Sequence, residues 1–80
     1  MNFSDVLGVY WWREEDGSIH YRARGIGPKY TRLYEWLPKT SYRCTSTDWP
    51  WDFFVFDDPE DHQRLINEFG FDVIKDRDNE

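Results

Sequence analysis

The sequence predicts an α+β fold: a small antiparallel β-sheet, built from two N-terminal hairpins and C-terminal strands, with one α-helix packed on its apolar face. Three observations support this fold class. An Asp-Gly turn signal at residues 16–17 separates two segments rich in β-branched and aromatic residues. A helix-start signature at residues 58–61 precedes an amphipathic stretch. The length of 80 residues suits a single domain, numbered 1–80.

The first hairpin pairs residues 6–12 with residues 18–24. A three-residue loop, 15–17, with Gly17 in the left-handed conformation, brings two apolar sets onto one face. These sets are Leu7, Val9 and Trp11 on the first strand and Ile19, Tyr21 and Ala23 on the second. A two-residue loop at 16–17 shifts the register by one and brings the second set beside Tyr10 and Trp12 instead. We prefer the three-residue loop because it gives one consistently apolar face.

The segment 30–36 is compatible with either a helix or a strand. Apolar residues recur there at helical spacing, which favours a helix. The same segment is rich in strand formers, and Leu37 precedes a proline, which disfavours the helical conformation. We therefore predict a strand over residues 30–36.

A second hairpin follows from that prediction, with a proline-containing turn at 37–40 and a partner strand over 41–45. A two-residue loop sets Leu33 opposite Cys44 on the apolar face, where we expect a packed and inert thiol. The opposite face then carries Arg32, Tyr34 and Trp36 with Arg43.

The last third of the chain predicts a strand, a helix and a final strand. Residues 52–57 read as a short buried strand, after which Asp58 caps the helix and Pro59 takes its first position. The apolar stripe of this helix consists of His62, Leu65, Ile66 and Phe69. Residues 71–74 form the final strand, and residues 75–80 are predicted to be a flexible acidic tail.

The composition describes a folded, acidic and aromatic chain. Aromatic residues make up 20% of the sequence and hydrophobic residues 39%, so large rings replace aliphatic side chains in the core. No apolar run reaches the ~18 residues of a membrane span, and residues 1–4 begin neither a signal peptide nor a transit peptide. We therefore expect a cytoplasmic protein without membrane association. The single cysteine, Cys44, leaves no internal disulfide.

Motifs that would indicate an enzyme are incomplete. Residues 25–27 lack the third glycine of a dinucleotide-binding loop, because Tyr30 occupies that position. A nucleophile with its base could be sought in Cys44 with His20 or His62, but we expect that thiol to be buried. The carboxylates that follow the buried strand are explained by the helix start and lack the ligand spacing of a calcium loop. We predict no enzymatic activity, no bound metal and no cofactor.

The charge is distributed unevenly along the chain. The net charge is −6, of which residues 1–18 contribute −3, residues 19–44 contribute +5 and residues 45–80 contribute −8. Spaced carboxylates on a small rigid fold imitate a phosphate array and attract a basic protein surface. Two tryptophans flank Pro50 in a stiff loop that either caps the core or anchors a partner. The residues predicted to bind this partner are Asp48, Trp49, Trp51, Asp57, Asp58, Glu60, Asp61 and Glu68.

The basic centre of the chain supports an alternative interface. Rings on a sheet surface stack on nucleobases, and neighbouring arginines attract phosphates, as in proteins that bind single-stranded nucleic acids. Arginines stacked on neighbouring rings also satisfy themselves within a fold, and an acidic domain opposes nucleic-acid binding. The residues of this alternative face, for single-stranded nucleic acid or an anionic nucleotide, are Tyr10, Trp12, His20, Arg22, Arg24, Arg32, Tyr34, Trp36 and Arg43.

In size, acidity and ring content the chain resembles the small inhibitor proteins of bacteriophages and plasmids, which include anti-restriction, anti-CRISPR and nuclease-immunity proteins. The resemblance implies stoichiometric binding instead of catalysis. We therefore predict a small acidic inhibitor or adaptor that docks onto a basic, nucleic-acid-handling protein. A structural or assembly protein that buries its rings by dimerising is a further alternative, so we expect either a monomer or a homodimer.

Overall fold

The computed structural model describes residues 5–76 and contains a five-stranded sheet with two helices. In chain order the elements are β1 (Val6–Arg13), β2 (Ile19–Ile26), α1 (Pro28–Trp36), η1 (Leu37–Lys39), β3 (Tyr42–Asp48), β4 (Trp51–Phe56), α2 (Glu60–Phe69), η2 (Gly70–Asp72) and β5 (Val73–Lys75). The strand order is β3-β4-β2-β1-β5. Neighbouring strands are antiparallel except for β1 and β5, which are parallel.

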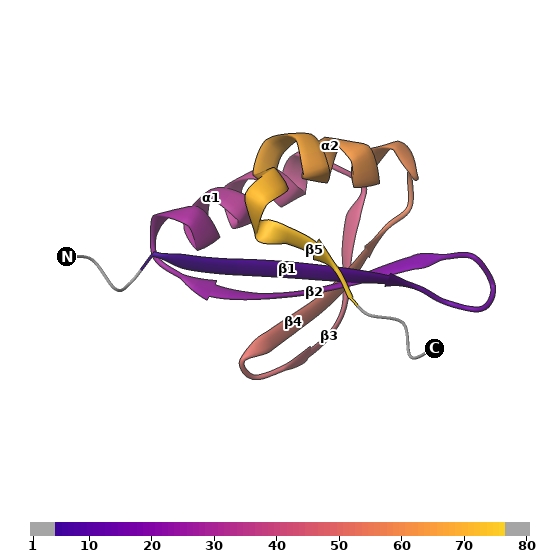
Figure 1. Ribbon diagram of the computed structural model, residues 1–80, viewed down its shortest axis with the longest axis horizontal. Coiled ribbons are helices and arrows are strands. Elements are labelled where there is room, and N and C mark those ends of the chain that lie inside the picture. Colours follow the sequence, from indigo (N-terminus) through magenta and orange to yellow (C-terminus); the bar gives the residue numbers. More distant parts are fainter. Residues whose placement is uncertain (1–4, 77–80) are drawn as a thin grey trace.

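The α+β class is therefore confirmed, with two corrections: the sheet is mixed instead of antiparallel, and it carries two helices instead of one. Both helices lie on the same side of the sheet (Figure 1). The parallel pair arises because the chain crosses over the sheet through α2 before it returns beside β1.

The helix that was not predicted is α1. It replaces the strand that we predicted over residues 30–36, so that prediction is wrong. Pro28 occupies the first turn of the helix, where its missing N–H is not needed. Leu33 and Leu37, four residues apart, are both fully buried. Burial of this helical apolar stripe outweighs the strand propensity of the segment, and Leu37 keeps a helical conformation (φ −53°, ψ −40°) although a proline follows it.

The first hairpin has the register that the sequence predicts. Val9 pairs with Ala23 and Trp11 with Tyr21, so the apolar sets share one face. The Gly17 N–H donates a hydrogen bond to the Glu14 carbonyl oxygen over 2.9 Å, and Gly17 has φ +90°. The left-handed glycine closes the three-residue loop, as expected for a turn followed by a bulge.

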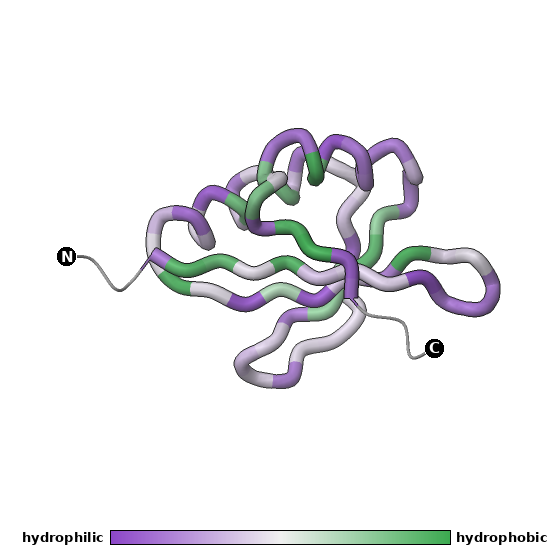
Figure 2. Tube along the Cα trace, viewed as in Figure 1, coloured by the Kyte–Doolittle hydropathy of each residue, from purple (hydrophilic) through white to green (hydrophobic). Residues whose placement is uncertain are grey.

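The core lies between this face of the sheet and the two helices. Its buried hydrophobic residues are Leu7, Val9, Tyr21, Ala23, Leu33, Leu37, Phe54, Leu65 and Phe69. Figure 2 shows the corresponding pattern, with hydrophobic stretches in β1 and mainly hydrophilic residues in the turns of the helices that face away from the sheet. At the centre of the core, the Tyr21 and Phe54 rings stack with their centroids 5.0 Å apart and an interplanar angle of 3°.

α2 begins at Glu60 with Pro59 at its N-cap position, one residue later than predicted, but Asp58 still caps the first turn. The Asp58 side chain accepts a hydrogen bond from the Glu60 N–H over 3.0 Å, and its backbone carbonyl accepts one from the Asp61 N–H. The Asp61 side chain is buried, and it accepts hydrogen bonds from the Ser41 N–H (2.9 Å) and hydroxyl (2.6 Å). This carboxylate therefore joins the start of α2 to the segment before β3.

The end of the chain differs from the prediction in its boundaries. Residues 71–72 belong to the 3-10 turn η2, and β5 begins at Val73. The Asp76 N–H donates a hydrogen bond to the Trp11 carbonyl oxygen over 2.7 Å, so the ordered structure extends into the predicted tail. The remainder of that tail, residues 77–80, lies outside the described residues.

The junction between β2 and β4 is short. It contains three residue pairs, from Tyr21 with Phe54 to Ala23 with Asp52, although both strands continue beyond it. Figure 1 shows β3 and β4 running steeply across the direction of β1 and β2. The two hairpins therefore diverge at both ends of the junction, and a hollow opens at each end.

The bonds of Asp61 generate a stability prediction. Asp61→Ala leaves the Ser41 N–H without its partner, so we expect the free energy of unfolding to fall by about 2 kcal/mol. Asp57→Ala is the matched control, because it removes an exposed carboxylate whose partner Arg43 is also exposed, and it should change stability little. Urea unfolding at neutral pH measures both variants, and equal effects would contradict the structural role of Asp61.

The stability that Asp61 contributes should depend on pH. Burial opposes ionisation of Asp61, but the hydrogen bonds from Ser41 and the charge of Arg64 outweigh it and hold the pKa of this carboxyl below 3.8. A carboxyl with a depressed folded-state pKa stabilises the fold above its unfolded pKa, and this contribution is lost as the pH falls through the folded value. The stability difference between wild type and Asp61→Ala should therefore shrink as the pH falls below 3.8.

Candidate functional site

Within residues 5–76 both helices lie on one face of the sheet, and no helix packs on the other face (Figure 1). The alternation of side chains along the strands places the predicted residues Tyr10, Trp12, His20, Arg22 and Arg24 there. Trp51 of β4 joins them, although the sequence analysis grouped it with the acidic surface: its ring centroid lies 5.8 Å from that of Tyr10. The first hairpin therefore presents an uncovered surface of rings and arginines, as predicted from its register.

The arginines of this face stack on its rings. The Arg22 guanidinium lies 5.2 Å from the Tyr10 ring centroid and 4.3 Å from that of Trp51, and the Arg24 guanidinium lies 4.9 Å from Trp51. Arg22 also forms an ion pair with Asp76 at 3.3 Å. Much of the positive charge on this face is thus already engaged by the chain itself.

The other predicted members of that face lie elsewhere because α1 is a helix. Arg32 pairs with Glu68 at 3.2 Å, the Tyr34 hydroxyl donates to Asp52, and the Trp36 ring packs edge-on against Phe69. These three side chains therefore belong to the helix-bearing side of the sheet. Arg43 stays on a strand, in β3.

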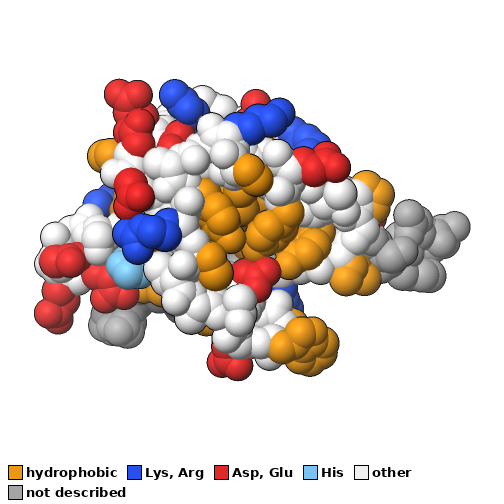
Figure 3. Space-filling model, turned by 180° about the vertical axis from the view of Figure 1, so that it is seen from behind, with side chains coloured by type: hydrophobic (Ala, Val, Ile, Leu, Met, Phe, Trp, Pro, Cys, Tyr) orange, Lys and Arg blue, Asp and Glu red, His pale blue; other side chains and the backbone are white. Residues whose placement is uncertain are grey.

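The predicted acidic surface is not one continuous array. Asp61 is buried, Asp58 caps α2, Asp57 pairs with Arg43 at 3.0 Å and Glu68 pairs with Arg32. Glu60 and Asp48 are exposed. Figure 3 shows carboxylates dispersed around the outline of the molecule and interspersed with basic side chains along one edge. Most of these carboxylates have structural partners within the fold.

The predicted position of Cys44 is wrong, since its side chain is exposed instead of packed in the core. β3 is an edge strand, and apart from Tyr42 its residues are all exposed. The Cys44 thiol lies 3.7 Å from the Ser46 carbonyl oxygen, and Cys44 does not line the hollow that His20 and His62 share.

The tip of the β3–β4 hairpin presents the most exposed tryptophan. Asp48 pairs with Trp51 in the last step of the ladder, so the tip contains only Trp49 and Pro50. The Trp49 side chain is 92% exposed, whereas Trp51 is half-buried against the sheet. Of the two roles that the sequence analysis left open for this loop, Trp51 packs on the sheet and Trp49 faces outward.

A hollow of about 640 Å³ opens beside this tip, where β2 and β4 diverge. It is lined by Val6, Arg24, Gly25, Ile26, Tyr30, Thr47, Trp49, Pro50, Trp51 and Asp52. Asp52 Oδ2 accepts hydrogen bonds from the Tyr30 and Tyr34 hydroxyls, each over 2.8 Å. Burial, together with these bonds to Asp52, raises the pKa of both phenols, so both remain protonated donors.

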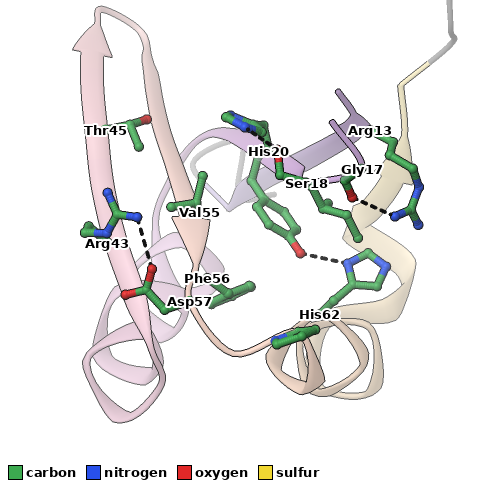
Figure 4. Close-up of a pocket in the computed structure, with 13 residues that line it drawn as sticks. Arg13, Gly17, Ser18, His20, Arg43, Thr45, Val55, Phe56, Asp57 and His62 are labelled. Carbon is green, nitrogen blue, oxygen red and sulfur yellow. Dashed lines mark hydrogen bonds and ion pairs between the residues drawn. The ribbon is translucent and has the colours of Figure 1, made fainter. Parts of the chain in front are cut away.

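A second hollow of about 520 Å³ lies at the other end of the junction (Figure 4). Arg43 and Arg13 stand on opposite sides of it, and His62 of α2 points toward the strands (Figure 4). The Tyr21 hydroxyl lies 2.8 Å from His62 Nδ1. Burial raises the pKa of Tyr21, so its hydroxyl stays protonated, and the tautomer of His62 sets which of the two groups donates this bond.

Four residues that build the hollow beside Trp49 were not predicted as site residues from the sequence: Val6, Ile26, Tyr30 and Asp52. Asp52 carried a usable signal, because alternation along the strand places it on the buried side between aromatic residues. A carboxylate at such a position needs hydrogen-bond donors. The donors themselves were hidden by the wrong assignment of residues 30–36.

The fold and these surfaces define a small mixed α+β domain. No protein-family model, no curated protein sequence and no solved structure matches this chain. Among residues 5–76 no group of three or more His, Cys, Asp and Glu side chains is placed to hold a metal ion. No helix in this part of the chain has the length and apolarity needed to cross a membrane.

The second hollow generates a prediction for His62. Burial, and secondly the positive charge of Arg13, lower the pKa of His62 below 6.5. Arg13→Gln should therefore raise this pKa part of the way toward its ordinary value, since burial remains. An NMR titration of the His62 ring measures both values, and a His62 pKa at or above 6.5 in the wild type would contradict the structure.

Proposed function

We propose that the chain is a non-enzymatic binding protein that docks onto a basic, nucleic-acid-handling protein through the tip of the β3–β4 hairpin. The observation that carries this proposal is the 92% exposure of the Trp49 side chain at the end of a paired hairpin. Tryptophan is among the residues that contribute most to binding energy when a partner buries them. An indole held in water by a short turn is suited to that role.

The surroundings of Trp49 support a docking surface. Val6 and Ile26, which line the same hollow, are 51% and 55% exposed. An apolar patch of this kind, rimmed by charged residues such as Asp48 and Arg24, is typical of a protein-binding site. The hydrophobic side chains would supply the desolvated centre of the interface.

The net charge supports a basic partner. A charge of −6 on 80 residues attracts a basic surface over distance and accelerates its encounter with the domain. Exposed carboxylates such as Glu60 contribute to this attraction without contacting the partner. The proposed activity is stoichiometric inhibition or adaptation, as in the phage and plasmid inhibitors that the chain resembles in size and charge.

Trp49→Ala should remove the anchor and weaken binding by about 2 kcal/mol or more, the loss typical of a central tryptophan. Affinity capture from a nuclease-treated bacterial lysate, quantified by mass spectrometry, tests this. Phe71→Ala is the matched control, because it removes another fully exposed ring (103%) from η2 on the helix-bearing side. Proteins captured by wild type and Phe71→Ala but not by Trp49→Ala would support the proposal, and equal capture by all three would contradict it.

A second candidate function is supported by the uncovered sheet face. Its rings and two arginines, Arg22 and Arg24, have the composition of a surface that binds single-stranded nucleic acid or an anionic nucleotide. The acidic charge of the domain and the stacking of these arginines on Trp51 both oppose it. We therefore rank it below protein docking.

Titration with short single-stranded oligonucleotides at low salt tests the second candidate. If it is correct, tryptophan fluorescence is quenched, and Arg22→Ala with Arg24→Ala reduces the affinity while added salt weakens it further. Lys29→Ala with Arg32→Ala removes the same charge from α1 on the helix-bearing side and serves as the control. Absence of quenching, or equal losses in both double variants, would remove this candidate.

A further inference from the structure

We propose that the hollow beside Trp49 receives a lysine or arginine side chain of the partner protein, with Asp52 as its counter-ion. This inference rests on the proposed docking function and names the chemistry that would be recognised. It is carried by three features of the hollow: a half-buried carboxylate without a basic partner, aromatic walls, and a basic side chain of the chain itself against one wall.

Asp52 and Asp5 are the half-buried carboxylates among residues 5–76 that form no ion pair with a described residue, and Asp5, which accepts a hydrogen bond from the Lys29 N–H, does not line the hollow. Asp72 and Asp76 each lie within 4.0 Å of a lysine or arginine nitrogen, and so does buried Asp61. Among residues 5–76, no lysine, arginine or histidine forms an ion pair with Asp52. A half-buried carboxylate without a cation is unfavourable, and an incoming basic group would relieve that cost.

The hydrogen bonds of Asp52 come from neutral groups, so they do not pair its charge. Both phenols, Tyr30 and Tyr34, donate to Oδ2 over 2.8 Å. These bonds orient the carboxylate, and because the phenols are neutral donors they bring no positive charge to it. They leave Oδ1 as the acceptor for a cationic donor.

The walls of the hollow suit a long basic side chain. Tyr30, Trp49 and Trp51 line it together with the apolar side chains of Val6 and Ile26. Aromatic rings attract cations through their electron-rich faces, and apolar walls bury the methylene stem of lysine or arginine. The volume of about 640 Å³ is large enough for such a side chain and lies within the usual range of ligand sites.

Arg24 already stacks on the Trp51 wall of the hollow, and removing its charge distinguishes a cationic occupant from an anionic one. Its guanidinium lies 4.9 Å from the Trp51 ring centroid at the rim of the hollow. A second cation entering beside it meets repulsion as well as the attraction of Asp52. Removing the Arg24 charge should therefore strengthen binding of a basic side chain, whereas an anionic occupant would bind more weakly after the same change.

The test uses the full chain, labelled with ¹⁵N, and the peptide acetyl-Gly-Gly-Lys-Gly-Gly-amide as the probe. NMR titration follows the indole N–H signals of Trp49 and Trp51. Two matched peptides carry Nε-acetyl-lysine or glutamate in place of lysine. We expect the lysine peptide to shift both indole signals with a saturating dependence on concentration, and the acetylated and glutamate peptides to bind at least about tenfold more weakly, as loss of a charge-assisted hydrogen bond implies.

Variants then assign the effect to Asp52. Asp52→Asn keeps an acceptor for the two phenols but removes the charge, and should weaken the lysine peptide by about tenfold or more. Glu35→Gln removes the same charge from an exposed position of α1 outside the hollow and should leave the affinity nearly unchanged. Arg24→Gln should strengthen it. Equal effects of Asp52→Asn and Glu35→Gln would overturn the proposal, as would weaker binding by Arg24→Gln.

The comparison of the lysine and acetyl-lysine peptides on the wild-type chain does not depend on any variant, so the proposal stays testable even if Asp52→Asn fails to fold. Its failure is also distinct from failure of the docking function. If Trp49→Ala abolishes capture while the two peptides bind equally, docking stands and the basic-side-chain site is removed. If Trp49→Ala captures the same proteins as wild type, the docking function itself is removed.

Discussion

The short junction between β2 and β4 is the constraint on which the rest of the structure depends. It joins the two hairpins by three residue pairs, and the parallel stack of Tyr21 on Phe54 holds it from the core side. Sheets twist because their strands do, and a junction of this length lets the two hairpins cross steeply instead of extending one flat sheet. Divergence on either side of so short a junction leaves a hollow at each end. Both hollows are therefore consequences of how the sheet is joined.

One-sided helix packing determines what remains for contact with other molecules. Because α1 and α2 both cover the same face, the rings of the opposite face have no helix against them, and the chain covers them partly with its own arginines. Stacking of Arg22 between Tyr10 and Trp51 stabilises that surface and at the same time occupies the ring faces that a nucleobase needs. The hairpin tip has no such cover at Trp49, so a partner finds an unoccupied ring there.

Local signals in the sequence were sufficient to predict an element where its secondary-structure propensity and the spacing of its apolar residues indicate the same structure. The alternation of Val9 and Trp11 with the Gly17 turn gave the first hairpin its register, and the Asp58 cap located α2. They were insufficient at α1, where strand propensity and helical spacing conflict and only the burial of Leu33 and Leu37 in the assembled core decides. That error also displaced Arg32, Tyr34 and Trp36 from their predicted face. The hollow beside Trp49 depends on contacts between distant segments, which no local pattern contains.

The carboxylates show why a net charge does not describe a surface. Asp61 joins α2 to the segment before β3, Asp58 caps α2, and Asp57 is paired with Arg43. All three carboxylates thus already have partners within the fold. An interface requires charge that the fold leaves unsatisfied, in a place that a partner reaches. Asp52 meets both conditions, because its hydrogen-bond donors are neutral and the hollow it lines is open beside an exposed indole. The distinction that matters for recognition is thus between carboxylates that the fold pairs with a basic side chain and those, such as Asp52, that it only orients.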